Sequence, residues 1–142
     1  MVTMRDGDVP DLLPGAPEPE PQFVTLAILW AAGELGKRHV PPDLLGAEAL
    51  TGVKTAIAAK ALALMAQVKG VVTLENVAES GAARVIESIK IPDEIEVKYR
   101  AATSTDGTLA LAAGQWDSLA DGFLALAVPG TPSRGLFPGA AR

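Results

Sequence analysis

The longest helical pattern of this sequence lies at residues 51–69, which read TGVKTAIAAKALALMAQVK. Its apolar residues recur every three or four positions, as they do on one face of an α-helix. Thr51 is a suitable N-cap residue, and Gly70 can adopt the left-handed conformation that ends many helices. We therefore expect a helix over 51–69 whose single apolar stripe consists of Val53, Ile57, Ala61, Leu64, Met65 and Val68.

Two other segments of the chain have the same helical spacing. Residues 23–38 end in basic side chains, which the helix dipole favours, and two prolines follow. Residues 115–128 are interrupted only by Gly122, and residues 43–49 can add a short turn. The expected stripes are Phe23, Leu26, Ala27, Trp30 and Ala31 in the first segment, and Trp116, Leu119, Ala120, Phe123 and Leu126 or Ala127 in the second.

A strand pattern lies at residues 94–100, which read EIEVKYR. Apolar and charged residues alternate, which places Ile95, Val97 and Tyr99 on one face of a strand. Pro92 and Asp93 favour a turn, so we expect a β-hairpin with residues 85–91. Residues 71–84 are ambiguous between helix and strand, and residues 101–107 form a polar loop.

The two ends of the chain have a different composition from its middle. Residues 1–21 hold five of the eleven prolines, and most of the acidic excess lies there. We expect a flexible acidic Pro-rich arm at 1–21, either a disordered leader or an arm that becomes ordered on a partner. A helical domain spans 22–128, and an irregular C-terminal tail spans 129–142. The predicted fold class is mostly α: a small helical bundle with a β-hairpin and irregular N- and C-terminal tails.

Composition limits the classes of function. Apolar residues make up 49% of the 142 residues, but many are alanine and only 4% are aromatic, so the expected core is thin and suits completion by neighbouring subunits. A net charge of −5 opposes binding of nucleic acid through its phosphates. The chain has no cysteine. We expect no membrane association, because residues 23–32 are too short to span a bilayer and Lys54, Lys60 and Gln67 interrupt residues 49–68.

No pattern points to catalysis. The one histidine, His39, lies at an expected helix end. No serine lies in the Gly-x-Ser-x-Gly motif of a catalytic nucleophile, so a Ser-His-acid triad is not indicated. Glu94 and Glu96 share a strand face, which a solvated surface explains better than an acid–base pair. The glycines at 33 and 36 lack phosphate-loop spacing. We predict a protein that is not an enzyme, with no catalytic residue, cofactor or metal site.

The candidate functional residues are therefore partner-binding ones. Trp116 fits core packing or an interface, and its helix leads into the C-terminal tail. Leu136 and Phe137 are bulky residues in a Gly/Pro-rich tail, so they either fold back on their own domain or dock on a partner. The predicted partner-binding set is Trp116, Phe123, Arg134, Leu136, Phe137 and Arg142.

The order of these elements resembles a known family. An alanine-rich helix precedes Glu87-Ser88-Ile89-Lys90-Ile91, then the alternating strand that ends at Tyr99, then a helix with Trp116 and Gly122. This order resembles the head–tail connector (adaptor) proteins of tailed bacteriophages and gene transfer agents. The resemblance covers about residues 23–128, and the matching positions are Glu87, Ser88, Tyr99, Trp116 and Gly122.

The resemblance implies a subunit of a ring, usually of twelve copies, that lies below the phage portal and links capsid to tail. Its partners would be the portal protein and further head–tail joining or tail proteins. DNA would pass through the lumen without specific binding. The location would be the virion, and the host cytoplasm during assembly. The alternative is another non-enzymatic virion or bacterial interaction protein, and an enzyme subunit is the least favoured class.

Overall fold

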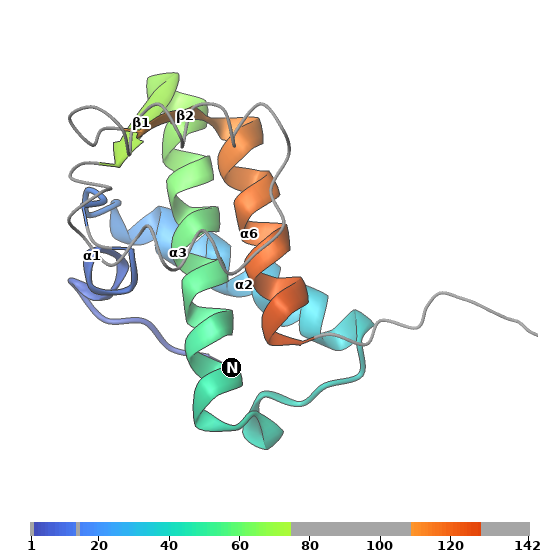
Figure 1. Ribbon diagram of the computed structural model, residues 1–142. Helices are drawn as coiled ribbons and strands as arrows, with labels where there is room; N and C mark the ends of the chain where they lie inside the picture. Colours follow the sequence, from blue (N-terminus) through green and yellow to red (C-terminus); the bar gives the residue numbers. More distant parts are fainter. Residues whose placement is uncertain (1, 14, 75–108, 129–142) are drawn as a thin grey trace, which may run out of the picture.

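The computed structural model describes residues 2–13, 15–74 and 109–128 (Figure 1). The described part is mostly helical and contains one antiparallel pair of strands, so the predicted fold class is confirmed. Along the chain, the elements are α1 (Asp8–Leu12), α2 (Pro21–Lys37), a 3-10 turn η1 (Pro42–Leu44), α3 (Ala47–Lys69), β1 (Val71–Leu74), β2 (Leu109–Ala112) and α6 (Ala113–Ala127).

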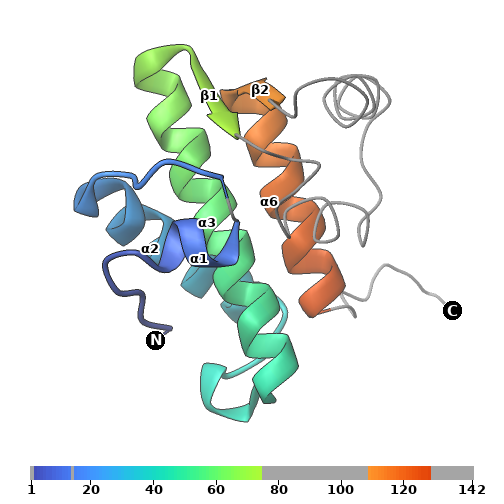
Figure 2. The same ribbon diagram turned by 60° about the vertical axis from the view of Figure 1, so that its left-hand side comes forward.

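Helix α3 is the centre of the fold. Figures 1 and 2 show α6 running antiparallel beside it, α2 crossing it, and α1 on the side away from α6. Contact on several sides buries α3 almost all round, from Val53 to Ala66. The expected single stripe is therefore wrong in detail. Ala56, Ala59 and Leu62 are fully buried as well, whereas Val68 is 74% exposed.

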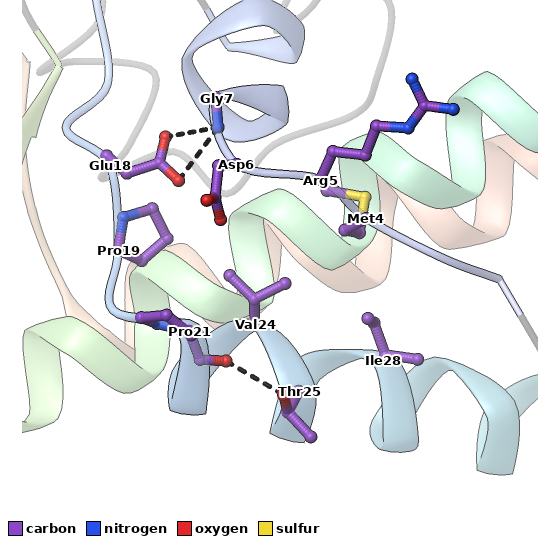
Figure 3. Close-up of a pocket in the computed structure, with 10 residues that line it drawn as sticks. All are labelled: Met4, Arg5, Asp6, Gly7, Glu18, Pro19, Pro21, Val24, Thr25 and Ile28. Atoms are coloured by element: carbon purple, nitrogen blue, oxygen red, sulfur yellow. Dashed lines mark hydrogen bonds between the residues drawn. The ribbon is translucent and has the colours of Figure 1, made fainter.

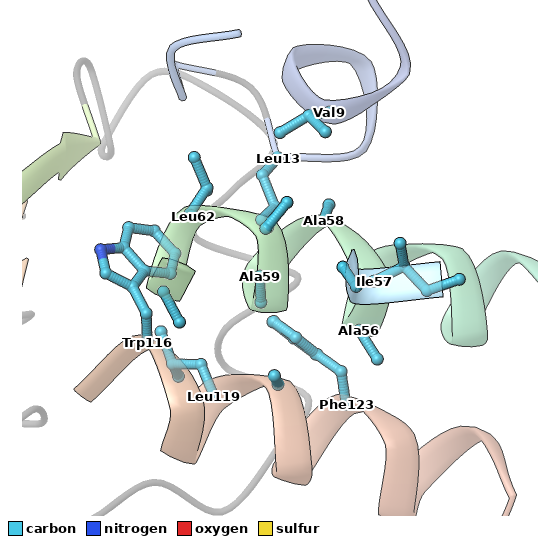
Figure 4. Close-up of a cluster of buried hydrophobic side chains, with 14 of the residues drawn as sticks. Val9, Leu13, Ala56, Ile57, Ala58, Ala59, Leu62, Trp116, Leu119 and Phe123 are labelled. Atoms are coloured by element: carbon cyan, nitrogen blue, oxygen red, sulfur yellow. The ribbon is translucent and has the colours of Figure 1, made fainter. Parts of the chain in front are cut away.

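Small side chains let α3 and α6 pack closely. A Cβ atom at Gly52 would lie only 2.6 Å from the Cβ of Ala127. Figure 4 shows Trp116, Leu119 and Phe123 reaching from α6 toward the alanines of α3. The indole Nε1–H of Trp116 also donates to the carbonyl oxygen of Val72 at 3.3 Å, which links α6 to β1.

By length and composition, α3 is the one described helix that would pass as a membrane span, with a mean hydropathy of 1.4. Within the fold, 61% of that apolar stretch is buried. A central core helix has the same composition as a membrane span, so this is weak evidence for membrane insertion.

The ends of the helices follow local chemistry. Helix α3 begins at Ala47 instead of Thr51, whose hydroxyl donates to the carbonyl oxygen of Ala47 at 3.0 Å within the helix, so the predicted N-cap is wrong. Gly70, with φ of 90°, ends α3 as predicted. After the C-cap of α2, Arg38, His39 has φ of 56°. Its N–H donates to Gly36 and the next N–H, of Val40, donates to Leu35, which is a Schellman motif.

The acidic N-terminal segment packs on α3, which was not expected. Val2, Val9, Leu13 and Ala16 are buried and belong to the core (Figure 4 shows Val9 and Leu13). The expectation of a flexible arm is therefore wrong for this segment: α1 and its C-cap residue place Val9 and Leu13, four residues apart, on one face. Pro10 lies within α1, Pro17 and Pro19 lie in the stretch before α2, and Pro21 is the first residue of α2.

Strands β1 and β2 pair antiparallel, with Val71 opposite Ala112 and Leu74 opposite Leu109. β1 lies in the segment that the sequence leaves ambiguous. β2 is not predicted, because its sequence LALA contains residues that favour helix, and only its alternating burial follows a strand pattern. The predicted hairpin of residues 85–91 and 94–100 lies outside the described residues.

Candidate partner-binding surface

The structure places the predicted partner-binding residues in two groups. Trp116 is fully buried and Phe123 is 3% exposed, both between α6 and α3. Core packing, the other interpretation of Trp116, accounts for its burial and its hydrogen bond to Val72. Neither side chain offers a surface to a partner in this fold. Arg134, Leu136, Phe137 and Arg142 lie outside the described residues.

The outward face of α2 is the strongest candidate in the described part. Leu26 and Leu29 lie one turn apart, and each is 52% exposed. Thr25, Gly33 and Gly36 extend the same exposed face, so no charge occurs on it between Gln22 and Lys37. The opposite face buries Ala27, Ala31 and Leu35 against the fold.

The sequence contains a signal for this face. A surface helix normally has apolar residues on one side only, and α2 has them on both. Leu26 was expected in the buried stripe and is exposed instead, because α3 contacts the side of α2 that carries alanines. The signal that could have located this surface is that α2 has more large apolar residues than one helix face can hold.

A pocket of about 670 Å³ opens between α2 and the N-terminal segment (Figure 3). Its apolar wall includes Met4, Val24 and Ile28, and the carboxylates of Asp6 and Glu18 lie on its rim. Arg5 also lines the pocket, but Figure 3 shows its guanidinium directed away from these two acids. The pocket thus combines an apolar wall with an acidic rim.

Two local contacts hold this rim. The N–H of Gly7 donates to both carboxylate oxygens of Glu18, at 3.0 and 3.1 Å. Gly7 has φ of 88°, a conformation that suits glycine, and directly precedes α1. The N–H of Arg5 donates to Asp8 at 2.8 Å. No sequence pattern indicates this pocket, because its residues come from two segments that only the fold brings together.

A polar junction connects α2, α3 and α6. The Lys60 ammonium donates to Asp117 at 2.8 Å and lies 5.4 Å from the centre of the Trp30 ring. Burial raises the pKa of the Asp121 carboxyl, an effect that nearby Lys60 partly opposes. These contacts join three helices, which is a positioning role within the fold.

A second charged group stands at the end of α2. Glu34 pairs with Lys37 at 3.0 Å and with Arg38 at 3.2 Å. The hydrogen bond from Lys37 lowers the pKa of Glu34, and the bond from Arg38 acts in the same direction. The Nε atom of Arg38 is buried and has no hydrogen-bond partner among the described residues.

The described residues contain no candidate metal-binding cluster. No group of three or more His, Asp or Glu side chains there is arranged to hold a metal ion. His39 lines a second open pocket, of about 520 Å³, beside Leu35, Val40 and two prolines. Its exposed position at the end of α2 agrees with the helix-end role expected from the sequence.

Comparison with known proteins yields no relative: no family model, no curated protein and no solved structure matches the chain significantly. The surface of α2, the adjoining pocket and the order of the sequence motifs therefore provide the basis for a functional proposal.

Proposed function

We propose that this chain is a non-enzymatic structural subunit of a protein assembly, and specifically a head–tail connector (adaptor) that forms a ring below a phage portal. In this role it links capsid to tail in the virion, after assembly in the host cytoplasm. The observation that carries the proposal is the charge-free outward face of α2, where Leu26 and Leu29 are half exposed.

The energetics favour covering this face. Fully burying a leucine side chain is worth about 1.5–3 kcal/mol relative to leaving it in water. Leu26 and Leu29 realise only part of that gain in the isolated chain, and a neighbouring subunit could supply the rest. Gly33 and Gly36 on the same face have open space around them, so another backbone can approach closely.

The charge of the chain suits a conduit for DNA. A protein that grips DNA presents clustered Lys and Arg to the phosphates. This chain has a net charge of −5, so DNA would pass through a ring of its copies without specific binding. The motif order that resembles the connector family supplies the portal as partner and twelve as the expected copy number.

The alternative, another non-enzymatic virion or bacterial interaction protein, would use the same α2 face. The two differ in their partner: a connector must bind a portal protein. Light scattering after size-exclusion chromatography, with and without portal protein from the same gene neighbourhood, separates them.

The α2 face is tested with the double variant Leu26→Ser, Leu29→Ser. We expect it to fold and to lose at least tenfold in its affinity for other copies or for the portal. Leu44→Ser is the matched control, because Leu44 is 78% exposed on η1, away from α2. Unchanged assembly of the double variant would contradict a role for this face. A full chain that stays monomeric with and without portal would contradict the connector proposal.

A further inference from the structure

We infer that the pocket between α2 and the N-terminal segment binds residues 129–142 of a neighbouring copy of this chain. This inference rests on the proposed self-association and specifies one of its contacts. The pocket has a volume of about 670 Å³, within the range of about 300–1,000 Å³ that is typical of ligand sites.

The chemistry of the two surfaces is complementary. Residues 129–142 contain two arginines and no acid, although the whole chain is acidic. Leu136 and Phe137 are the large apolar residues of that segment, and Arg134 precedes them by two positions. The pocket offers an apolar wall of Met4, Val24 and Ile28 to such a pair, and its acidic rim offers partners to an arginine.

The acidic rim has an unused group. The Glu18 carboxylate already accepts two hydrogen bonds from Gly7, whereas Asp6 is exposed and accepts none from the described residues. Arg5, the nearest cation in sequence, is directed away from both acids (Figure 3). An arginine supplied from outside would therefore meet Asp6 without displacing an existing ion pair.

The positions of the pocket and of the end of α6 favour binding between copies. Figures 1 and 2 show α1 and the start of α2 on one side of α3, with α6 on the other. The segment after Val128 thus starts from the side of the molecule opposite the pocket. A contact from one side of a copy to the opposite side of the next is heterologous, and such contacts close into rings when the rotation permits.

The cysteine-free sequence allows a direct test by disulfide cross-linking. One full-length chain carries Thr25→Cys, since Thr25 lines the pocket and is exposed. A second full-length chain, with a tag of different mass, carries Gly135→Cys. After oxidation with copper phenanthroline, we expect the mixed pair to form a covalent heterodimer at least fivefold above the yield of a Leu44→Cys and Gly135→Cys pair.

A variant that removes the charge complementarity sharpens the test. Asp6→Lys in the pocket chain should lower the heterodimer yield by at least threefold. Asp11→Lys is the matched control, because Asp11 is an exposed acid of the same segment that does not line the pocket. Equal yields from these two variants would overturn the acidic rim as a recognition element.

The chain that carries both Thr25→Cys and Gly135→Cys identifies docking within one copy. An intramolecular disulfide there, together with no heterodimer from the mixed chains, would overturn the inference in favour of a tail that folds back on its own subunit. Background yield in every pair would also overturn it. Either result leaves the proposed function testable, because assembly through Leu26 and Leu29 is measured separately.

Discussion

Helices α2 and α3 reverse the usual relation between side-chain size and burial. α3 is rich in alanine and is buried on almost every side, whereas α2 carries larger apolar residues and exposes Leu26 and Leu29. Alanine contributes little apolar area but allows several neighbours to come close, as at Gly52 and Ala127. The comparison shows that α3 is the central helix because several other elements can pack closely against it. The apolar side chains of α2 that no other element covers then form a surface that another protein can bind.

Leucine truncation should separate the two helices most clearly. Leu62→Ala in α3 should cost about 2–5 kcal/mol of unfolding free energy, because the side chain is fully buried. Leu29→Ala in α2 should cost less than about 1 kcal/mol, since half of that side chain is already in water. Chemical denaturation of both variants at low protein concentration measures the difference. Similar costs would show that α2 is covered within a single copy.

The N-terminal segment buries a further side of α3, so truncating its buried side chains should also lower the free energy of unfolding. Leu13→Ala should lower the unfolding free energy by about 2 kcal/mol, near the lower end for a buried leucine, because the short helix α1 can detach locally. Asp11→Ala, an exposed change on the same helix, is the control. Urea denaturation checks both variants, and equally small effects would restore the interpretation of residues 1–21 as an unpacked arm.

Replacing glycine by alanine should change the stability of the protein in opposite directions in the two helices. Gly52→Ala in α3 should destabilise by about 1–2 kcal/mol, because the overpacking against Ala127 exceeds the gain in helix propensity. Gly33→Ala in α2 should stabilise by up to about 1 kcal/mol, since the added methyl group meets open space. Thermal unfolding of each variant gives the sign. A stabilising Gly52→Ala would mean that α3 and α6 are not in close contact there.

The junction of α2, α3 and α6 should show a small pH dependence. The pKa of Asp121 is raised in the fold by burial, so its ionisation opposes folding, and the cost appears as pH rises above the ordinary value near 4. Asp121→Asn should therefore raise the melting temperature slightly at pH 7 and have no such effect at pH 3. The gain should stay below about 1 kcal/mol, because the Asp121 side chain is withdrawn from water only in part and solvent still screens its charge.

Glu34 should act in the opposite direction. Its pKa is lowered chiefly by the hydrogen bond from Lys37, so its contribution to stability is present above the ordinary pKa and is lost as pH falls. Glu34→Gln should therefore destabilise slightly at pH 7 and not at pH 3. A shared pH profile for the Asp121 and Glu34 variants would contradict the assigned directions.

Local sequence patterns were sufficient to predict the type and approximate bounds of the main elements. The helices around residues 23–38, 51–69 and 115–128 were found because apolar spacing and the glycine or proline that ends a helix act within a few residues. The stripe of α6 was correct for Trp116, Leu119, Ala120 and Phe123, which are buried. These side chains pack chiefly against one neighbour, α3, so the helical period alone identifies them. The stripe was wrong at its end, because Leu126 is 56% exposed, Ala127 is only partly buried, and the buried Leu124 was not predicted.

Tertiary structure decided what each face meets. The burial of Leu13, the exposure of Leu26, the pairing of β1 with β2, and the pocket beside Asp6 and Glu18 all depend on segments that are distant in the chain. Periodicity shows that a helix has an apolar side, but it does not give the number of neighbours that the helix will have. That number is set by how closely the other elements can approach α3, and this closeness depends on the small side chains at each contact.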